Sequence, residues 1–486
     1  MIFNSVTYLL LVVLVVPLYW LLPNRARLYL AFGSSLVFYA FWRPEFALVM
    51  LFSAVLDYFV SHQLPKHEDP QHRRRLLYVS LVGNLGLLFY FKYLFFFATS
   101  GWQLLTLIGL DLPAPAFSIV LPLGISFYTF QTISYTVDVY RRQIQPEADF
   151  VLYGSYVTFF PQLVAGPILR ASEVIPQLRT RPPFDLAFIA RGLRRILFGL
   201  FLKVVLADNL APWVDQGFDQ PVAALSALDV WTLGFLFGFQ IYFDFSAYSH
   251  IALGTGLLMG IEFPENFNFP YLASSPRDFW QRWHISLSSW IRDYLYVPLT
   301  GSRFGTSSTG GLGVEDREQA KATSRAGALF ATWAIMGLWH GANWTFVFWG
   351  LYHATWVFGQ RLVAPLARGV PPRLRALGGW AITLPLMMLG WIPFRARSIG
   401  DALQMLSSIV NPSAYRWLGM RENAYLIAAL VMLSCVLAYL ASRWVMPVLR
   451  RCPALLLPIE TVAFAVIGGL VFVFLRPIQQ FIYFQF

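Results

Sequence analysis

The chain has 486 residues, of which 57% are hydrophobic and 13% are charged, and its formal net charge is +11. Soluble domains carry about 25% charged residues, and they rarely expose apolar patches larger than a few hundred Å². This composition excludes a free soluble enzyme, a disordered chain and a fibrous repeat, so we predict that lipid is the solvent of most of the protein. Two cysteines are too few for a disulfide framework and lack the spacing of a metal site.

Apolar runs that resemble membrane helices follow one another along the chain. A spanning helix needs about 20 mainly apolar residues, and we expect about ten to twelve spans, some of them tilted or re-entrant. We therefore predict an all-α polytopic membrane protein that forms one membrane domain over residues 1–486, with a flexible loop near 300–325. The clearest runs cover residues 6–22, 28–42, 46–60, 76–98, 117–135, 184–206, 225–242, 326–339, 344–358, 380–393, 425–439 and 461–474.

The basic residues form short clusters between the apolar runs, as at Arg25/Arg27, Arg73–Arg75 and Arg450/Arg451. A nucleic-acid-binding surface would also be basic, but clusters at the ends of apolar runs follow the positive-inside pattern of membrane proteins. Contact with anionic lipid head groups explains them, and we expect no nucleic acid partner.

Familiar nucleotide-binding and nucleophile motifs are absent, since the chain has no GxxxxGK[ST], HExxH or GxSxG. Polar residues within apolar stretches are costly in lipid and become candidates for function. Phe159–Pro167 contains two prolines and a glycine, which predicts a broken or re-entrant helix that lines a cavity. Asp244 lies among aromatic residues, and either a buried structural pair or a place in a pathway explains it.

Charged and aromatic residues alternate densely in Arg277–Tyr294. An amphipathic helix in the membrane interface explains the tryptophans of this segment but gives no role to His284. At helical spacing its large apolar residues fall on one stripe, which comprises Phe279, Trp283, Leu287 and Trp290.

A second motif, Gly337–Trp344, places His340 between two apolar runs with no charge nearby. Such a histidine is either a packing residue that bonds a carbonyl group on a neighbouring helix or a functional group. Gly341 and Ala342 follow it, so the backbone can approach a ligand closely. A neutral imidazole with a pKa of about 6.5 is ready to accept a proton at physiological pH, which makes His340 a candidate general base.

Together these segments resemble the membrane-bound O-acyltransferase (MBOAT) family, and in particular its bacterial alginate O-acetylation branch. The resemblance rests on RDFWQRWHISLSSWIRD at Arg277–Asp293 and GLWHGANW at Gly337–Trp344. It covers most of the chain through LPLGISFYTFQTISY, FFPQLVAGPI, YFDFSAYS, ENFNFPY and FIYFQF, in the same order. The chain departs from the pattern of that branch at Ala247, at His250 and in Pro298–Arg303.

The resemblance implies a bundle of membrane helices around a tunnel, in which an acyl group passes from a cytoplasmic donor to an extracytoplasmic hydroxyl. It implies acetyl-CoA as the donor, no permanently bound cofactor, an exported polysaccharide as the acceptor, and a place in the bacterial inner membrane. His340 matches the catalytic histidine of the family and His284 its second histidine. Nothing in the sequence indicates a bound metal.

An alcohol that attacks a thioester loses its proton in the transition state, and His340 is the expected base. The oxyanion that forms needs a hydrogen-bond donor, which Asn343, His284 or a backbone N–H would supply. Asp244 and Trp339 are further candidates for support of the substrate or the oxyanion.

Arg282 and Arg292 are candidates for binding the phosphates of coenzyme A, although a membrane-anchoring role explains them equally well. Because the chain has no GxSxG motif or Ser/His/Asp domain, we expect an extracytoplasmic partner protein to complete the transfer to sugar.

Two alternatives remain open from the sequence. Within the family, a teichoic acid D-alanyl transfer protein takes its acyl group from a thioester on a carrier protein. Outside the family, a transporter or lipid flippase would use His340 and Asp244 to relay protons without acyl chemistry.

Overall fold

The computed structural model describes residues 3, 5–163, 166–180, 182–301, 322–367, 369–475 and 481–482. These residues form helices and connecting segments, and there is no strand among them. The all-α fold predicted from the sequence is confirmed. Most of the loop predicted near 300–325 lies outside the described residues.

Six helical stretches of the described chain are long and apolar enough to cross a membrane, which makes this a multi-pass membrane protein. This is fewer than the about ten to twelve spans expected, in part because some apolar runs form helices shorter than about 20 residues. Examples are α2 (Asn24–Ala40) with 17 residues and α6 (Ile125–Tyr140) with 16. The six stretches are Pro44–Lys66, Pro70–Leu107, Leu186–Phe218, Pro372–Arg395, Glu422–Leu449 and Ala454–Val473.

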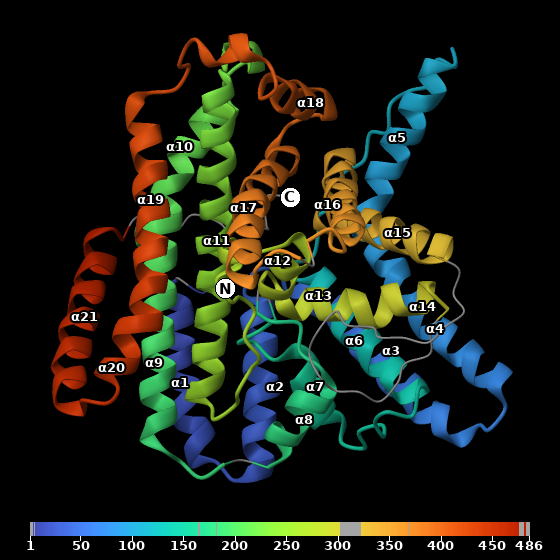
Figure 1. Ribbon diagram of the computed structural model, residues 1–486. Coiled ribbons are helices and arrows are strands. Elements are labelled where there is room, and N and C mark those ends of the chain that lie inside the picture. The colour runs from blue at the N-terminus through green and yellow to red at the C-terminus, as the bar shows by residue number, and fades with distance from the viewer. Residues whose placement is uncertain are drawn as a thin grey trace. The chain divides into compact units, whose positions relative to one another are not determined.

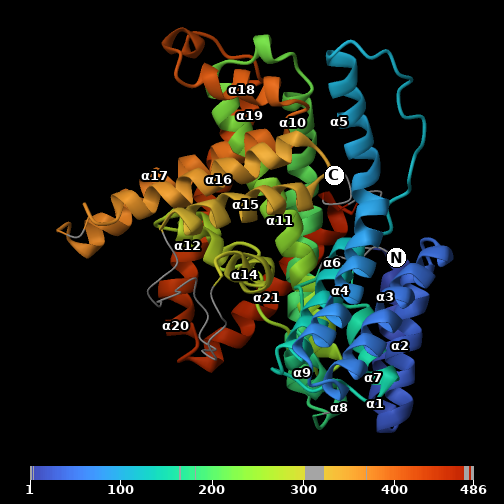
Figure 2. The same ribbon diagram turned by 90° about the vertical axis from the view of Figure 1, so that its right-hand side faces the viewer.

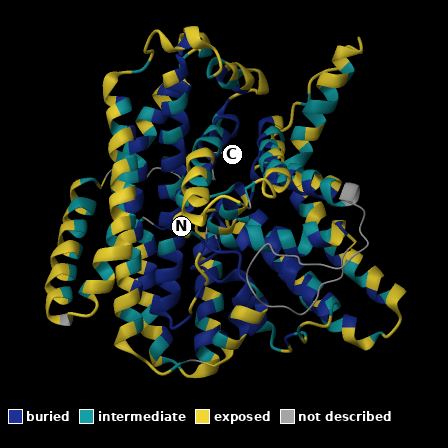
Figure 3. Cartoon of the chain, in the orientation of Figure 1, coloured by how far each residue is buried: buried dark blue, intermediate teal, exposed yellow. Residues whose placement is uncertain are grey.

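Several of these stretches expose their apolar side chains. No residue of Ala454–Val473 is buried, and only 11% of the apolar window in Glu422–Leu449 is buried. Figure 3 shows both helices as exposed over most of their length. Exposed apolar surface of this extent is suited to lipid and would be unfavourable in water.

The chain divides into two compact units. One comprises Met1–Ile196 and Ser249–Glu265, and the other comprises Leu197–Tyr248 and Asn266–Phe486. The 32-residue helix α11 (Ala227–Leu258) contributes residues to both.

In the first unit the buried helix α6 packs against α3 and α4, and α2 packs against α7. The chain leaves the helical conformation after Thr158, and Phe159, Phe160 and Leu163 are buried. The interruption predicted from the prolines of this segment is therefore confirmed. The helices of this unit are α1 (Val6–Leu21), α2, α3 (Pro44–Gln63), η1 (Leu64–Lys66), α4 (Pro70–Leu88), η2 (Phe89–Tyr93), α5 (Leu94–Leu107), α6, α7 (Phe150–Thr158), α8 (Ala171–Arg179) and most of α9 (Leu186–Leu200) (Figure 1).

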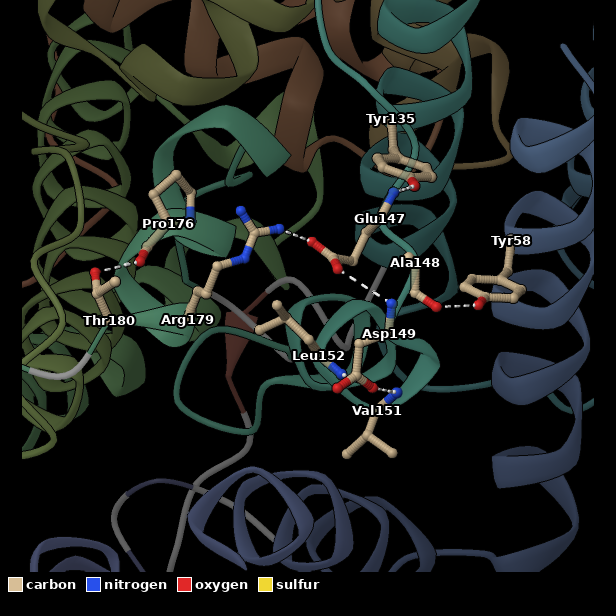
Figure 4. A network of polar contacts seen from close by, with 10 residues as sticks. All are labelled: Tyr58, Tyr135, Glu147, Ala148, Asp149, Val151, Leu152, Pro176, Arg179 and Thr180. Atoms are coloured by element: carbon tan, nitrogen blue, oxygen red, sulfur yellow. Dashed lines mark hydrogen bonds and ion pairs between the residues drawn. The ribbon is translucent and has the colours of Figure 1, made fainter. Parts of the chain in front are cut away.

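A polar network holds the connection between α6 and α7 (Figure 4). The side chain of Glu147 forms an ion pair with Arg179, while its backbone N–H donates to the Tyr135 hydroxyl over 2.8 Å. The Tyr58 hydroxyl donates to the carbonyl oxygen of Ala148 over 2.6 Å. These bonds attach one short connection to α3, α6 and α8.

The second unit contains the segments with the two histidine motifs. Three of its elements, η3, η6 and η8, are π-helical. Its described helices are η3 (Phe201–Ala207), α10 (Asp208–Phe218), η4 (Val222–Ala224), α11, η5 (Pro270–Leu272), α12 (Pro276–Arg282), α13 (Ile285–Ile291), η6 (Arg292–Tyr296), α14 (Val297–Leu299), α15 (Ala322–His340), α16 (Trp344–Val363), α17 (Pro372–Arg395), α18 (Ile399–Ser408), η7 (Pro412–Tyr415), α19 (Glu422–Leu440), η8 (Ala441–Val445), α20 (Met446–Leu449) and α21 (Pro453–Val473).

Candidate active site

Helices α15 and α16 lie side by side in both views (Figures 1 and 2). A Cβ on Gly337 would lie 2.1 Å from the carbonyl oxygen of Phe346, and one on Gly350 would lie 2.1 Å from that of Trp333. Since only glycine lacks a Cβ, these two residues allow the helices to approach closely. The pair places His340, the last residue of α15, at the turn between the helices.

His340 lies among aromatic rings and is 4% exposed. Its ring centroid is 4.9 Å from that of Trp339, 5.0 Å from that of Trp349 on α16 and 5.5 Å from that of Phe394 on α17. Rings from three successive helices therefore hold the imidazole in an apolar environment. An imidazole in its neutral form is able to accept a proton during a reaction.

The segment around His284 is not the single amphipathic helix predicted from its spacing. It breaks between α12 and α13, where His284 has left-handed backbone angles of φ 43° and ψ 57°. Residues other than glycine rarely adopt this conformation, which costs about 1–3 kcal/mol. The apolar stripe is buried in protein, as the low exposure of Phe279, Trp283, Leu287 and Trp290 shows.

Asn266 holds the break in place. Its side-chain oxygen accepts hydrogen bonds from the backbone N–H of Ser286 at 3.2 Å and from the Ser286 hydroxyl at 2.9 Å, and it lies 3.2 Å from Nδ1 of His284. Its backbone carbonyl accepts from the N–H of Ile285 at 3.0 Å. Asn266 thereby accepts from the first two backbone N–H groups of α13 and orients the His284 ring.

These bonds determine the tautomer of His284. Because the backbone N–H of Ser286 can only donate, the Asn266 atom that it meets is the oxygen, and Nδ1 of His284 must then carry a proton. Burial lowers the pKa of His284 to about 3, so the ring is neutral at physiological pH. Nε2 therefore keeps its lone pair and is a hydrogen-bond acceptor.

Trp339 links the two histidines. Its ring centroid lies 6.4 Å from that of His284 and 4.9 Å from that of His340. The structure thus brings together three of the residues predicted from the sequence, His284, Trp339 and His340, around one indole ring.

The other predicted site residues have contacts of their own. Asn343 is exposed, and its side chain caps α16 by accepting from the backbone N–H of Thr345 at 3.0 Å. Arg282 forms an ion pair with Asp278 at 2.7 Å. Arg292 pairs with Asp293 at the start of η6.

Asp244, on α11, belongs to an ion cluster with Lys203 of η3 and Asp208 of α10. The ammonium group of Lys203 lies 2.8 Å from Oδ1 of Asp208 and 2.9 Å from Oδ1 of Asp244, and Lys203 is 2% exposed. Oδ2 of Asp244 accepts the backbone N–H of Ile482 over 2.8 Å. Of the two interpretations of Asp244, this geometry favours the structural pair.

Three residues that the sequence analysis did not single out belong to this part of the molecule: Asn266, Lys203 and His353. His353 is buried on α16, four residues after Trp349, and its ring lies 4.8 Å from the ring of Trp349. Its position four residues after Trp349 places both residues on one face of a helix, and this spacing is the feature of the sequence that could have identified it. Among the described residues, no group of three or more His, Cys, Asp or Glu side chains is placed to hold a metal ion.

Replacement of Asn266 by alanine should destabilise this site. Each buried donor left without a partner costs about 1–3 kcal/mol, so we expect a lower melting temperature of the purified protein in detergent. Asn268→Ala is the matched control, because Asn268 is exposed and only its backbone takes part in the hydrogen bonds found there. Equal melting temperatures for the two variants would contradict the role given to Asn266.

Known proteins are similar to this chain over most of its length. A family model described as MBOAT, membrane-bound O-acyltransferase family, matches residues 140–311. A protein of Azotobacter vinelandii named probable alginate O-acetylase is 38% identical over 85% of this chain and 78% of its own length. The peptidoglycan O-acetyltransferase of Helicobacter pylori is 35% identical over 78% of this chain and 72% of its own length.

A weaker similarity connects the chain to the teichoic acid D-alanyltransferase of Bacillus subtilis, which is 29% identical over 49% of this chain and 59% of its own length. The relatives thus transfer different acyl groups to different acceptors, as their names state. Taken with the multi-pass helical fold, the extent of identity to the two O-acetyltransferases shows that the chain is an O-acyltransferase of the membrane-bound O-acyltransferase family.

Proposed function

We propose that this protein takes an acetyl group from cytoplasmic acetyl-CoA and passes it across the bacterial inner membrane for O-acetylation of an exported polysaccharide. The observation that carries the proposal is the position of His340, buried among aromatic rings and joined through Trp339 to the oriented, neutral His284. Similarity to an alginate O-acetylase and a peptidoglycan O-acetyltransferase supports acetyl as the group and a surface polysaccharide as the acceptor.

In the proposed step, a hydroxyl oxygen attacks the thioester carbonyl carbon while His340 takes the hydroxyl proton. The carbon–oxygen bond forms, the carbon–sulfur bond breaks, and the proton passes from the imidazolium to the departing thiolate. The products are the acetyl ester and free coenzyme A thiol, so His340 returns to its neutral form. A positioned base of this kind contributes about 10²–10⁴ in rate.

His284 supports this step as an acceptor. With Nδ1 donating to Asn266, its Nε2 can accept a hydrogen bond but cannot donate one to the oxyanion. Trp339 has an indole N–H that can only donate, and its ring contacts both imidazoles. We therefore assign oxyanion stabilisation to Trp339 in preference to His284, with Asp244 supporting the site through the ion cluster.

The test uses membrane vesicles that contain this protein, a secreted acetyltransferase partner and the polysaccharide. With [acetyl-¹⁴C]acetyl-CoA supplied on the cytoplasmic side, we expect label in the polysaccharide as base-labile ester. Vesicles that lack the partner should show little label in sugar, because the partner makes the final transfer.

The alternatives are tested in the same vesicles, with a D-alanyl carrier protein or a labelled lipid or solute supplied in place of acetyl-CoA. Transfer of D-alanine from a carrier protein, without transfer of acetyl, would replace the proposal by the D-alanylation function. Movement of unmodified lipid or solute without any ester product would replace it by transport. Efficient acetylation of sugar by the purified chain alone would remove the partner from the proposal.

A further inference from the structure

We propose that α3, α4 and α6 of the first unit bind a sodium ion at Asp57. This site goes beyond the proposed function and does not depend on acyl chemistry. Asp57 lies on α3, within the apolar stretch Pro44–Lys66, and is 0% exposed. A carboxylate inside a membrane-spanning segment is costly, and such residues are usually paired or functional.

Each of the three helices contributes two buried polar residues spaced four apart. α3, α4 and α6 pack against one another (Figures 1 and 2), and residues at this spacing share one face of a helix. All six side chains are 0% exposed. This set, the Asp57 cluster, comprises Ser53 and Asp57 on α3, Ser80 and Asn84 on α4, and Thr132 and Thr136 on α6.

Neutral groups surround the carboxylate of Asp57. The side-chain amide of Asn84 donates to Oδ2 of Asp57 at 2.9 Å, and the side-chain oxygen of Asn84 accepts from the Thr132 hydroxyl at 3.3 Å. Ser80 and Thr136 also lie close enough to interact with the carboxylate. Among the described residues, no lysine, arginine or histidine forms an ion pair with Asp57.

Three oxygen atoms of the cluster have bonding capacity that the described residues do not use. Oδ1 of Asp57 and the hydroxyl oxygens of Ser53 and Ser80 are buried and lack a hydrogen-bond partner within the described ranges. Buried polar atoms without partners are unfavourable, and a buried charge without a counter-charge is more so. A proton would neutralise Asp57 but would form one hydrogen bond, whereas a metal cation contacts several oxygen atoms at once.

The chemistry of these ligands defines the ion. Carboxylate, amide and hydroxyl oxygens are ligands for hard cations. The cluster contains one carboxylate, so a monovalent cation balances its charge, while a divalent cation would leave a positive charge inside an apolar bundle. A compact set that includes a full negative charge suits sodium better than the larger potassium ion.

The purified full-length protein in detergent tests the proposal, in sodium chloride or in choline chloride at equal ionic strength. We expect sodium to raise the melting temperature by about 5 °C at saturation, because a ligand that binds only the folded state stabilises it. Bound ²²Na⁺, measured by scintillation proximity, should reach a single ion per chain. Unlabelled sodium chloride should displace it, and choline chloride should not.

Asp57→Asn removes the charge and keeps the shape of the side chain, and its oxygen can still accept from Asn84. This variant should fold, fail to bind ²²Na⁺ and melt at the same temperature in the two salts. Asp111→Asn is the matched control, because it makes the same change at an exposed position of the same unit. The control should bind sodium as the wild type does.

Ser80→Ala leaves the charge of Asp57 in place and removes one proposed ligand. It should raise the sodium concentration for half-maximal binding about tenfold. Ser134→Ala is its matched control, since Ser134 is also buried but its hydroxyl donates to the Gln131 carbonyl oxygen of its own helix at 2.8 Å. The affinity of this control for sodium should be that of the wild type.

Two results would overturn the sodium site. Equal melting temperatures of the wild type in the two salts, with no ²²Na⁺ retained, would show that the cluster holds no sodium and that Asp57 is buried with a proton. Sodium binding that is unchanged in both Asp57→Asn and Ser80→Ala would show that the ion binds elsewhere.

Discussion

Replacement of His340 by glutamine is expected to lower acetyl transfer by about 10²–10⁴-fold, because the variant loses the base that accepts the hydroxyl proton. Glutamine is close to histidine in size and retains hydrogen-bonding groups, but it does not take up a proton at physiological pH. The aromatic surroundings of His340 should therefore still form. Initial rates of label incorporation in the vesicle assay, normalised to the amount of folded protein, measure this effect.

His353→Gln is the matched control for this variant. His340 and His353 both contact the indole of Trp349, with ring centroids 5.0 Å and 4.8 Å away, and both are buried. Each of the two variants therefore perturbs the packing around the same tryptophan. We expect His353→Gln to keep transfer within about tenfold of the wild type, well short of the loss of a general base. Equal losses in the two variants would show that His340 is a packing residue.

The second large effect is expected from Lys203→Met. Methionine matches the length of the lysine stem but leaves the buried carboxylate of Asp244 without its cation. Removal of one partner from a buried ion pair costs about 3–5 kcal/mol. We therefore expect the variant in detergent to lose its monodisperse form at a much lower temperature than the wild type when both are heated.

A double variant distinguishes the loss of charge pairing from a simple loss of packing. In Lys203→Met/Asp244→Asn the buried carboxylate is neutral, and the asparagine oxygen can still accept the backbone N–H of Ile482. The carboxylate that remains, on Asp208, is 14% exposed and thus partly solvated. Stability should return toward the wild-type value, and a double variant no more stable than Lys203→Met would contradict the electrostatic explanation.

The sequence was sufficient to predict the fold class, and it singled out His284, Trp339 and His340 as candidates. Composition indicates lipid as the solvent, and the two histidine motifs indicate which residues to examine. His284, Trp339 and His340 lie together in the structure, although their proposed roles await the experiments above. Short motifs of this kind can be identified from the sequence because residues that are neighbours in the chain are also neighbours in the folded protein.

Other features could not be predicted because they depend on contacts between distant residues. Helical spacing favours one continuous helix through His284, whereas the break depends on Asn266, 18 residues earlier. A pocket of the second unit is lined by residues of α12, α13, η6, α15 and α16, so none of these segments displays it alone. Arg292 was a candidate for the donor site and lines this pocket, while Arg282 pairs with Asp278 instead.

The π-helical segment Phe201–Ala207 determines which residues of this helix face one another. Residues five apart lie about 140° apart around an α-helix, but a π-helix bonds each residue to the one five positions on and so places them on one face. The backbone N–H of Asp208 donates to the carbonyl oxygen of Lys203, and their side chains meet at 2.8 Å. Deletion of one residue between them would leave a continuous helix with normal α geometry and every charge present. Lys203 and Asp208 would then be four residues apart, a spacing at which side chains of an α-helix also lie on one face, so the π-helical turn accommodates one additional residue and keeps the charged pair together.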